Sequence, residues 1–196
     1  PLNPMPPTDT RPTSMRDRAR TAYPSLSWVC RDPGRLIAFG FGSGLIRPAS
    51  GTWGTLLAWA IWVAAAPAAS DWAIGAFLAL AFLYGCWACH RVGRELQQPD
   101  HVGMVWDEMV AFWLVLWLLT PATPQRFGWA HWGWQLAAFV LFRFFDAVKP
   151  GPVRWADQIF KGAGWRGGWG IVFDDLVAAF CTLVVLALLR HFIAQA

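Results

Sequence analysis

The chain has 196 residues, of which 56% are hydrophobic and only 14% are charged, whereas roughly 25% of the residues of an average soluble domain are charged. So few charged side chains cannot cover the surface of a soluble globule of this size, so the composition argues against one. The net charge is only +4, and the basic residues lie between apolar runs rather than in one stripe. We therefore expect no nucleic-acid partner.

The N-terminal segment differs in composition from the rest. Residues 1–34 are rich in Pro, Ser, Thr and Arg and lack the apolar core of roughly 7 to 15 residues that marks a signal peptide. We interpret residues 1–34 as a flexible, basic, Pro-rich cytoplasmic tail and residues 35–196 as a membrane-embedded domain. The excess of Arg over acidic residues favours a tail that stays beside an anionic membrane leaflet.

Five uncharged runs follow the tail. Two of them, 48–70 and 72–90, have 23 and 19 residues, and the other three, 109–125, 127–142 and 176–189, have 17, 16 and 14. A helix needs about 20 mainly apolar residues to cross the hydrocarbon core of a bilayer. We therefore predict an all-α, polytopic integral membrane bundle of four to five transmembrane or partly re-entrant helices.

The distribution of basic residues predicts the orientation of these helices. If the N-terminus is cytoplasmic and the passes are centred near 52–69, 72–90, 109–121, 128–144 and 174–189, all 16 basic residues except Arg126 and Arg190 fall on the cytoplasmic side. The positive-inside rule strongly favours this orientation. We therefore expect the functional site on the cytoplasmic face, in contact with membrane lipids.

The four cysteines do not indicate a redox or metal site. Cys86 and Cys89 form a CxxC pair, but this pair lies inside a predicted spanning helix and has no second pair of ligands. We interpret both as buried apolar residues.

The first segment whose residues suit a chemical role is rich in glycine and hydroxyl side chains, AFGFGSGLIRPASGTWGTLL at 38–57. Hydroxyls such as Ser43 and Thr52 can bind phosphate oxygens or cap the following helix. The spacing matches neither a dinucleotide fingerprint nor a P-loop. A helix that enters the membrane after Thr52 would direct free N–H groups at the cytoplasm and suit an anion; a re-entrant loop or a close helix-packing seam is the alternative.

An acidic pair, Asp107 and Glu108, stands at the start of the third apolar run, within the sequence VWDEM. Adjacent carboxylates are costly at a membrane boundary unless they are solvated, paired or bound to a cation. Mg²⁺ prefers one or two carboxylates together with water and substrate phosphate, so this pair could form half of a magnesium site. The alternative is a solvated helix end, where acids complement the helix dipole. His101 could assist proton transfer, or it could be an ordinary surface residue.

The third segment, FRFFDAVKPGPVRWAD at 142–157, mixes basic and acidic residues. Arg143, Asp146 and Lys149 are spaced three apart and would share one helix face. Such a face offers two cations for a phosphate and one carboxylate to orient them or to bind a metal. The Lys-Pro-Gly-Pro sequence should end the helix, so that Arg154 and Asp157 return toward the site. Contact between juxtamembrane charges and lipid headgroups would explain the basic residues but not the acids.

A second acidic pair, Asp174 and Asp175, follows the Gly-rich sequence at 161–170 and opens the last apolar run. Two acidic pairs at two helix entrances on one face favour a shared divalent-cation site over two independent helix caps.

Taken in order, GFGSGL, SGTWGTL, VWDE, FRFFDAVKP with VRWAD, and GGWGIVFDDLVA resemble the motifs of the phosphatidylglycerophosphatase A family, which are lipid phosphatases of the bacterial inner membrane. The resemblance runs from about residue 36 to residue 189. One departure is Ser50, which stands where the family usually has a proline.

The resemblance implies Mg²⁺-dependent hydrolysis of phosphatidylglycerophosphate to phosphatidylglycerol and inorganic phosphate, the last step of phosphatidylglycerol biosynthesis. The acids that it implies as catalytic and metal-binding residues are Asp107, Glu108, Asp146, Asp174 and Asp175, with Asp157 as a further acid. Our candidates for binding the substrate phosphate are Arg143, Lys149, Arg154, Ser43 and Thr52.

The sequence contains no motif of the phosphatases that form a covalent intermediate, so we expect direct attack by water, with one of the acids as base. A protein of another class, a small ion transporter or channel, would use the acidic pairs as a cation site. The clustering of the acids at helix entrances, with almost none inside the apolar runs, argues against this alternative.

Overall fold

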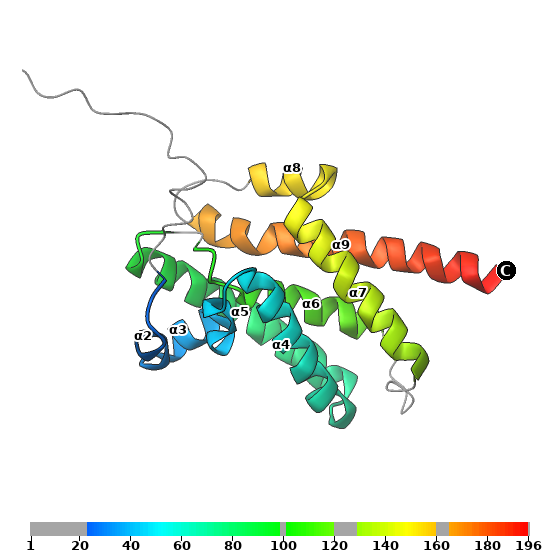
Figure 1. Cartoon of the computed structure of the whole chain (residues 1–196), viewed down its shortest axis with the longest axis horizontal. Helices are drawn as coiled ribbons and strands as arrows, with labels where there is room; N and C mark the ends of the chain where they lie inside the picture. The colour runs from blue at the N-terminus through cyan, green and yellow to red at the C-terminus, as the bar shows by residue number, and fades with distance from the viewer. Residues whose placement is uncertain (1–22, 99–100, 120–128, 160–164, 196) are drawn as a thin grey trace, which may run out of the picture.

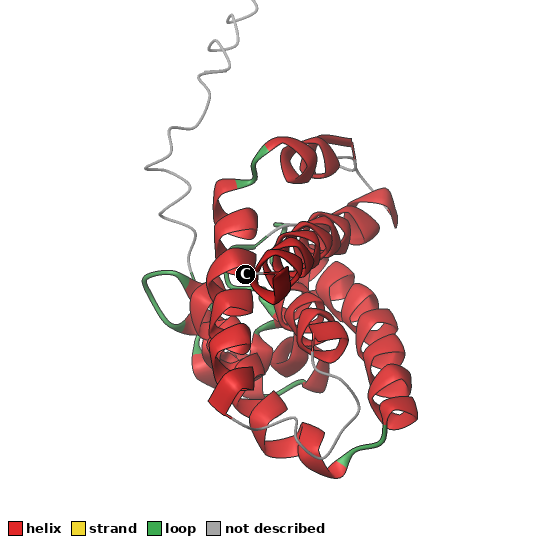
Figure 2. Ribbon diagram, turned by 90° about the vertical axis from the view of Figure 1, so that its right-hand side faces the viewer, coloured by secondary structure: helices red, strands yellow, loops and turns green. Residues whose placement is uncertain are grey.

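The computed structural model describes residues 23–98, 101–119, 129–159 and 165–195. Every regular element in these ranges is a helix, so the all-α prediction is confirmed for them (Figures 1 and 2). The elements are α2 (Leu26–Cys30), α3 (Pro33–Ala38), the 3₁₀ helix η1 (Gly40–Leu45), α4 (Ser50–Ala65), the 3₁₀ helix η2 (Ala66–Ala68), α5 (Asp71–Glu95), α6 (Trp106–Leu119), α7 (Trp129–Val148), α8 (Gly151–Ile159) and α9 (Trp165–Gln195).

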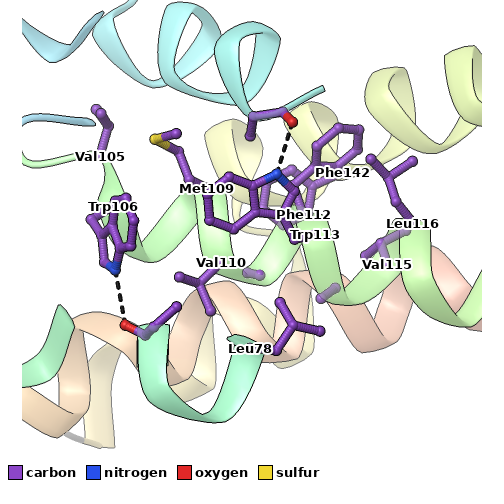
Figure 3. Close-up of a cluster of buried hydrophobic side chains, with 14 of the residues drawn as sticks. Leu78, Val105, Trp106, Met109, Val110, Phe112, Trp113, Val115, Leu116 and Phe142 are labelled. Atoms are coloured by element: carbon purple, nitrogen blue, oxygen red, sulfur yellow. Dashed lines mark hydrogen bonds between the residues drawn. The ribbon is translucent and has the colours of Figure 1, made fainter. Parts of the chain in front are cut away.

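Helix α6 forms the centre of the bundle and packs against α4, α5, α7 and α9. Its side chains from Met109 to Trp113 are all buried. Two indoles fasten it to its neighbours: Trp106 Nε1 donates to the carbonyl of Ala81 in α5 at 2.9 Å, and Trp113 Nε1 donates to the carbonyl of Ala58 in α4 at 2.7 Å (Figure 3). Because a buried indole N–H needs an acceptor, these two bonds fix the position of α6 along its own axis relative to α4 and α5.

Helix α7 crosses α9 and lies against α6 (Figure 1). It also reaches α4 through long side chains. Trp59 stacks on Phe139 with ring centroids 5.7 Å apart, and Trp59 Nε1 donates to the buried Gln135 Oε1 at 2.7 Å.

Two helices among the described residues are long and apolar enough to cross a membrane, α5 and the Phe173–Gln195 part of α9, with mean hydropathy of 1.8 and 2.3. Helices α4 and α6, at 16 and 14 residues, are shorter than a full crossing requires. The prediction of four to five passes is therefore not confirmed.

Large apolar side chains nevertheless cover the outer faces of the long helices. On α5 and α9 the exposed ones are Phe77, Leu80, Leu83, Trp87, Phe180, Val184, Leu188 and Phe192. Soluble monomers rarely expose contiguous apolar surface of this extent. The pattern is typical of helices whose outer faces contact lipid.

The Gly-rich segment before α4 is a packing seam. Ser50 Oγ donates to the carbonyl of Val102 at 2.6 Å, and the Val105 N–H donates to the carbonyl of Ala38 at 3.0 Å. Gly40 has φ +53°, and a Cβ there would lie 2.7 Å from Val105 Cγ2. Of the two alternatives for this segment, the observed contacts favour close packing against the residues that precede α6.

The N-terminal boundary differs from the expectation. Within the predicted tail, residues 26–30 form α2 and residues 33–34 open α3, and α3 is tied to the end of α5. Arg91 pairs with Asp32 at 2.8 Å, and Arg35 pairs with Glu95 at 2.8 Å. The hydrogen bonds from Arg91 hold the pKa of Asp32 below its usual value. Residues 1–22 of the predicted tail lie outside the described residues.

The end of α7 is as predicted. The helix stops at Val148, Lys149 takes a positive φ of 48°, and α8 begins at Gly151. Pro150 cannot continue a helical hydrogen-bond ladder, so the Lys-Pro-Gly-Pro sequence turns the chain here.

The packing of α5 on α6 predicts a position-specific glycine effect. A Cβ at Gly85 would lie 2.6 Å from Trp106 Nε1, so Gly85→Val must displace the indole that bonds Ala81. Overpacking of this kind costs about 1–3 kcal/mol, which corresponds to a fall of about 2 to 12 °C in unfolding midpoint for a chain of this length. Circular dichroism of the protein in detergent measures the midpoint.

The matched control is Gly133→Ala in α7, where a Cβ would meet nothing within 4 Å. This substitution should leave the midpoint unchanged or raise it, because alanine favours a helix more than glycine does. Equal melting of the two variants would show that the indole contact does not hold the bundle together.

Candidate active site

The five acids predicted as site residues come from three helices. Asp107 and Glu108 lie in the first turn of α6, Asp146 lies near the end of α7, and Asp174 and Asp175 lie in α9. Helix α9 begins at Trp165, so its acidic pair is well inside the helix rather than at its N-terminus. The helix-cap alternative therefore does not explain Asp174 and Asp175, because the dipole effect is confined to the first turn.

These acids are close to one another, and three of them are buried. Asp107, Asp174 and Asp175 are only 6%, 7% and 4% exposed. Asp175 is repelled by the other four carboxylates, and Glu108 is repelled by Asp146 and Asp174. Since like charges are costly to bury together, this group needs compensating cations.

Arg143 supplies the first compensating charge. Its Nη1 lies 2.5 Å from Glu108 Oε2 and 2.7 Å from Asp146 Oδ2. The same nitrogen lies 3.5 Å from Thr55 Oγ1 in α4. Of the three residues predicted to share one helix face, Arg143 and Asp146 pair within α7, whereas Lys149 follows the end of that helix with a positive φ. One guanidinium links α4, α6 and α7.

Lys149 supplies the second compensating charge. Its Nζ lies 2.5 Å from Asp174 Oδ2, so the end of α7 is bound to α9. Among the described residues, Arg143 and Lys149 pair with three of the five acids. Counted over these described residues, the group has more carboxylates than cations.

Glu108 lies directly against the first turn of α4. A Cβ on Gly51 would collide with its carboxylate, so a larger residue here would have to displace the Glu108 side chain. Thr55 Oγ1 donates to the carbonyl of Gly51 at 2.9 Å, one turn along the same helix. The sequence predicts an anion at the start of α4, and the anion that the structure has there is the Glu108 side chain.

Three predicted phosphate-binding residues have different surroundings. Ser43 Oγ donates to the carbonyl of Gly40 at 2.7 Å, inside η1. Thr52 is half-buried in the first turn of α4, and Arg154 is exposed on α8. The side chain of Asp157 lies outside the described residues. Phosphate binding by Ser43, Thr52 and Arg154 therefore stays a prediction.

His101 is buried in the segment before α6. Its ring packs against Tyr23 and Phe39, with centroids 5.1 Å and 5.5 Å away, and Nδ1 accepts a hydrogen bond from the Gly103 N–H at 2.9 Å. These contacts correct the surface alternative and give the ring a structural role. Proton transfer by His101 stays a prediction.

Gly51 and Thr55 are the site residues that our list of candidates omitted. Their signal in the sequence is the spacing of four, which stacks them on one face of a helix. That spacing alone does not reveal that Glu108 and Arg143 cover this face.

No three His, Cys, Asp or Glu side chains among the described residues form a ready-made set of metal ligands. All four cysteines are free thiols. Cys86, Cys89 and Asp107 border the same narrow gap between α5 and α6. Cys89 is fully buried, as expected for an apolar role, and Cys86 is half-buried.

The crowding of carboxylates makes a prediction about stability. Asp175→Asn removes a buried charge that four other acids repel, so it should stabilise the fold when no divalent cation is added. We expect the unfolding midpoint in detergent with chelator to rise by about 2–4 °C, which corresponds to about 1 kcal/mol for a chain of this length. Site residues commonly trade stability for function in this way.

The control is Asp32→Asn, which removes an acid that pairs with Arg91 at the surface. It should leave the midpoint unchanged or lower it slightly. A lower midpoint for Asp175→Asn than for Asp32→Asn would contradict net repulsion within the group.

Comparison with known proteins assigns the chain to a family. A family model described as Phosphatidylglycerophosphatase A matches residues 36–190. A phosphatidylglycerophosphatase A of Haemophilus influenzae is 39% identical over 160 residues, which cover 82% of this chain and 90% of the relative. The phosphatidylglycerophosphatase A of Escherichia coli K12 is 34% identical over 161 residues, which cover 82% of this chain and 85% of the relative.

A third relative comes from Bacteroides thetaiotaomicron and is named "Putative phosphatidylinositol-3-phosphatase". It is 37% identical over 159 residues, which cover 79% of this chain and 92% of the relative. No solved structure matches the chain. On the family match and the two phosphatidylglycerophosphatases, the chain belongs to the phosphatidylglycerophosphatase A family, and it is a phosphatase.

Proposed function

We propose that this phosphatase hydrolyses phosphatidylglycerophosphate to phosphatidylglycerol and inorganic phosphate, with Mg²⁺ as cofactor, at the cytoplasmic face of the bacterial inner membrane. The observation that carries the proposal is the group of five acids, three of them buried, with Arg143 and Lys149. This group lies in a bundle whose long helices expose apolar side chains.

The relatives support a lipid substrate. Two are named phosphatidylglycerophosphatase A, and the name of the third denotes a phosphatase of phosphatidylinositol 3-phosphate. Both names describe removal of a phosphate group from a phosphatidyl lipid. We extend this substrate class to the present chain.

The donor set suits Mg²⁺ by its chemistry. Carboxylate oxygens are the hard donors that this ion prefers, and in the described part of the chain the five acids outnumber Arg143 and Lys149, which pair with three of them. Mg²⁺ is usually held by one or two carboxylates, with water and substrate phosphate completing its shell. Such a site needs no set of three protein ligands in advance. When bound, the ion would neutralise the phosphomonoester and acidify a water molecule.

The residues of the chain have separate tasks in this reaction. Arg143 and Lys149 hold positive charge toward the phosphoryl oxygens, on which negative charge accumulates as the P–O bond breaks. Their ion pairs with Glu108, Asp146 and Asp174 orient them before substrate binds. One of the acids accepts the proton of the attacking water. Phosphatidylglycerol leaves with its alcohol oxygen, and inorganic phosphate carries the oxygen of the water.

A membrane location follows from the same features. The apolar outer faces of α5 and α9 would contact acyl chains, and nearly all basic residues precede or connect the apolar runs on one predicted side. By the positive-inside rule this side is cytoplasmic. The headgroup of a lipid made from cytosolic precursors would reach the acids there.

Phosphate release from phosphatidylglycerophosphate in detergent micelles tests the reaction and its cofactor. We expect activity with Mg²⁺, none with excess chelator, and a loss of roughly 100-fold or more in Asp107→Asn and Asp174→Asn, because each removes a buried carboxylate of the site. Asp71→Asn is the matched control. It should keep full activity, because Asp71 lies in the first turn of α5, a helix that carries none of the five acids.

Full activity in either site variant, or indifference to chelator, would contradict the metal-assisted mechanism. Phosphatidate and phosphatidylinositol 3-phosphate serve as competing substrates in the same assay. Equal rates on all three lipids would show that the protein is a phosphatase of phosphatidyl lipids that does not select phosphatidylglycerophosphate.

Cysteine labelling of intact cells tests the orientation. In a cysteine-free background, Ala68→Cys, in the short connection after α4, should react with a membrane-impermeant maleimide. Gln97→Cys, after α5, should react only once the membrane is permeabilised. Both positions are exposed, so access to the reagent depends on the side of the membrane. The reverse pattern would show that the site faces outward.

A further inference from the structure

We infer that Glu108 and Asp146 are positioning residues that hold Arg143 for the substrate phosphate, rather than ligands of the divalent cation. This inference rests on the proposed phosphatase reaction and divides the five acids into two groups with different tasks. Thr55 belongs to the positioning group.

The first observation is the convergence of three acceptors on one nitrogen. Nη1 of Arg143 lies 2.5 Å from Glu108 Oε2, 2.7 Å from Asp146 Oδ2 and 3.5 Å from Thr55 Oγ1. These acceptors come from three helices. The Arg143 side chain is only 17% exposed. Together the three acceptors fix the position and the plane of the guanidinium.

The second observation is the opposite edge of the same group. Nε of Arg143 is buried and has no hydrogen-bond acceptor among the described residues. A buried donor without an acceptor is unfavourable, so such a group in a functional site points to a missing ligand. Phosphate oxygens are the preferred partners of a guanidinium edge. Nη1 of Arg143 therefore binds acceptors of the protein itself, and the Nε edge of the guanidinium is left for the substrate phosphate.

The third observation is the confinement of Glu108. Its carboxylate is wedged between the Gly51 backbone, where a Cβ would collide with it, and Arg143. Mg²⁺ requires near-octahedral coordination and keeps several waters. The Gly51 backbone and Arg143 therefore already occupy two sides of this carboxylate. Asp146 is three residues from Arg143 on α7 and pairs with it within one helix.

One or two of Asp107, Asp174 and Asp175 would then hold the cation, because the described side chains include no ready-made set of three ligands. All three are less than a tenth exposed. Asp174 also pairs with Lys149. The two helices α6 and α9, which supply these acids, pack directly against each other.

Binding of Mn²⁺ to the purified full-length chain in detergent tests the division without any turnover. Electron paramagnetic resonance of free Mn²⁺ gives the dissociation constant. We expect Glu108→Gln and Asp146→Asn to stay within about twofold of the unsubstituted chain, and Asp175→Asn to bind at least tenfold more weakly. Weakening by Glu108→Gln or Asp146→Asn as large as that by Asp175→Asn would overturn the inference.

A double-mutant cycle on phosphate release tests the action of Glu108 through Arg143. Arg143→Ala and Glu108→Gln should each raise KM more than they lower kcat. The double variant should have a kcat/KM within about threefold of Arg143→Ala alone, because two residues that act as a unit are not additive. If the fold-losses of kcat/KM in the two single variants instead multiply in the double variant, Glu108 has a role separate from Arg143 and the inference is overturned.

Thr55 gives a conservative comparison. Thr55→Ser keeps the hydroxyl and should keep KM within about twofold, whereas Thr55→Val has the same shape without the hydroxyl and should raise KM. Equal KM values for the two variants would remove Thr55 from the positioning group. If the unsubstituted chain binds no Mn²⁺ and ignores chelator, the proposed cofactor is wrong, and the Arg143 cycle alone then decides the role of Glu108.

Discussion

The ion pairs of Arg143 are the interaction on which both the bundle and the site depend. One guanidinium links α7 to Glu108 in α6 and reaches Thr55 in α4. In surroundings of low polarity such pairs are strong, and leaving one partner unpaired is costly. The relative placement of the three helices and the geometry of the site therefore cannot change independently. This coupling makes position 51 sensitive, because a side chain there would displace the Glu108 carboxylate that pairs with Arg143.

The remainder of the bundle is held by apolar contacts and a few polar bonds. Indole N–H groups of Trp59, Trp106 and Trp113 each find an acceptor on a neighbouring helix. The long helices meanwhile present apolar side chains outward. Such a molecule needs a solvent that accepts apolar surface, and the polar chemistry is concentrated where α6, α7 and α9 bring their acids together. This division suits a phosphatase whose substrate has acyl chains and a charged headgroup.

The family assignment and the geometry support each other through separate observations. The family match rests on residues 36–190 as a sequence, whereas the burial of Asp174 and Asp175 inside α9 is a property of the fold. Buried carboxylates without a helix-cap role reduce stability. A protein keeps such residues when their function outweighs that cost. The proposed roles of cation binding and of Arg143 positioning give each of the five acids such a function.

Local sequence patterns suffice to predict the helical class, the end of α7 at the Lys-Pro-Gly-Pro turn and the candidate acids, because composition, proline chemistry and acidic pairs are local properties. The packing of the helices establishes which acid meets which cation, that Gly51 and Thr55 border the site, and that His101 packs among aromatic rings. It also showed α2 and α3 bound to α5, where the sequence suggests a tail. These features depend on contacts between residues far apart in the chain, 35 positions for Glu108 with Arg143 and 88 for Thr55 with Arg143. The packing of the helices sets such distances, and no local pattern encodes them.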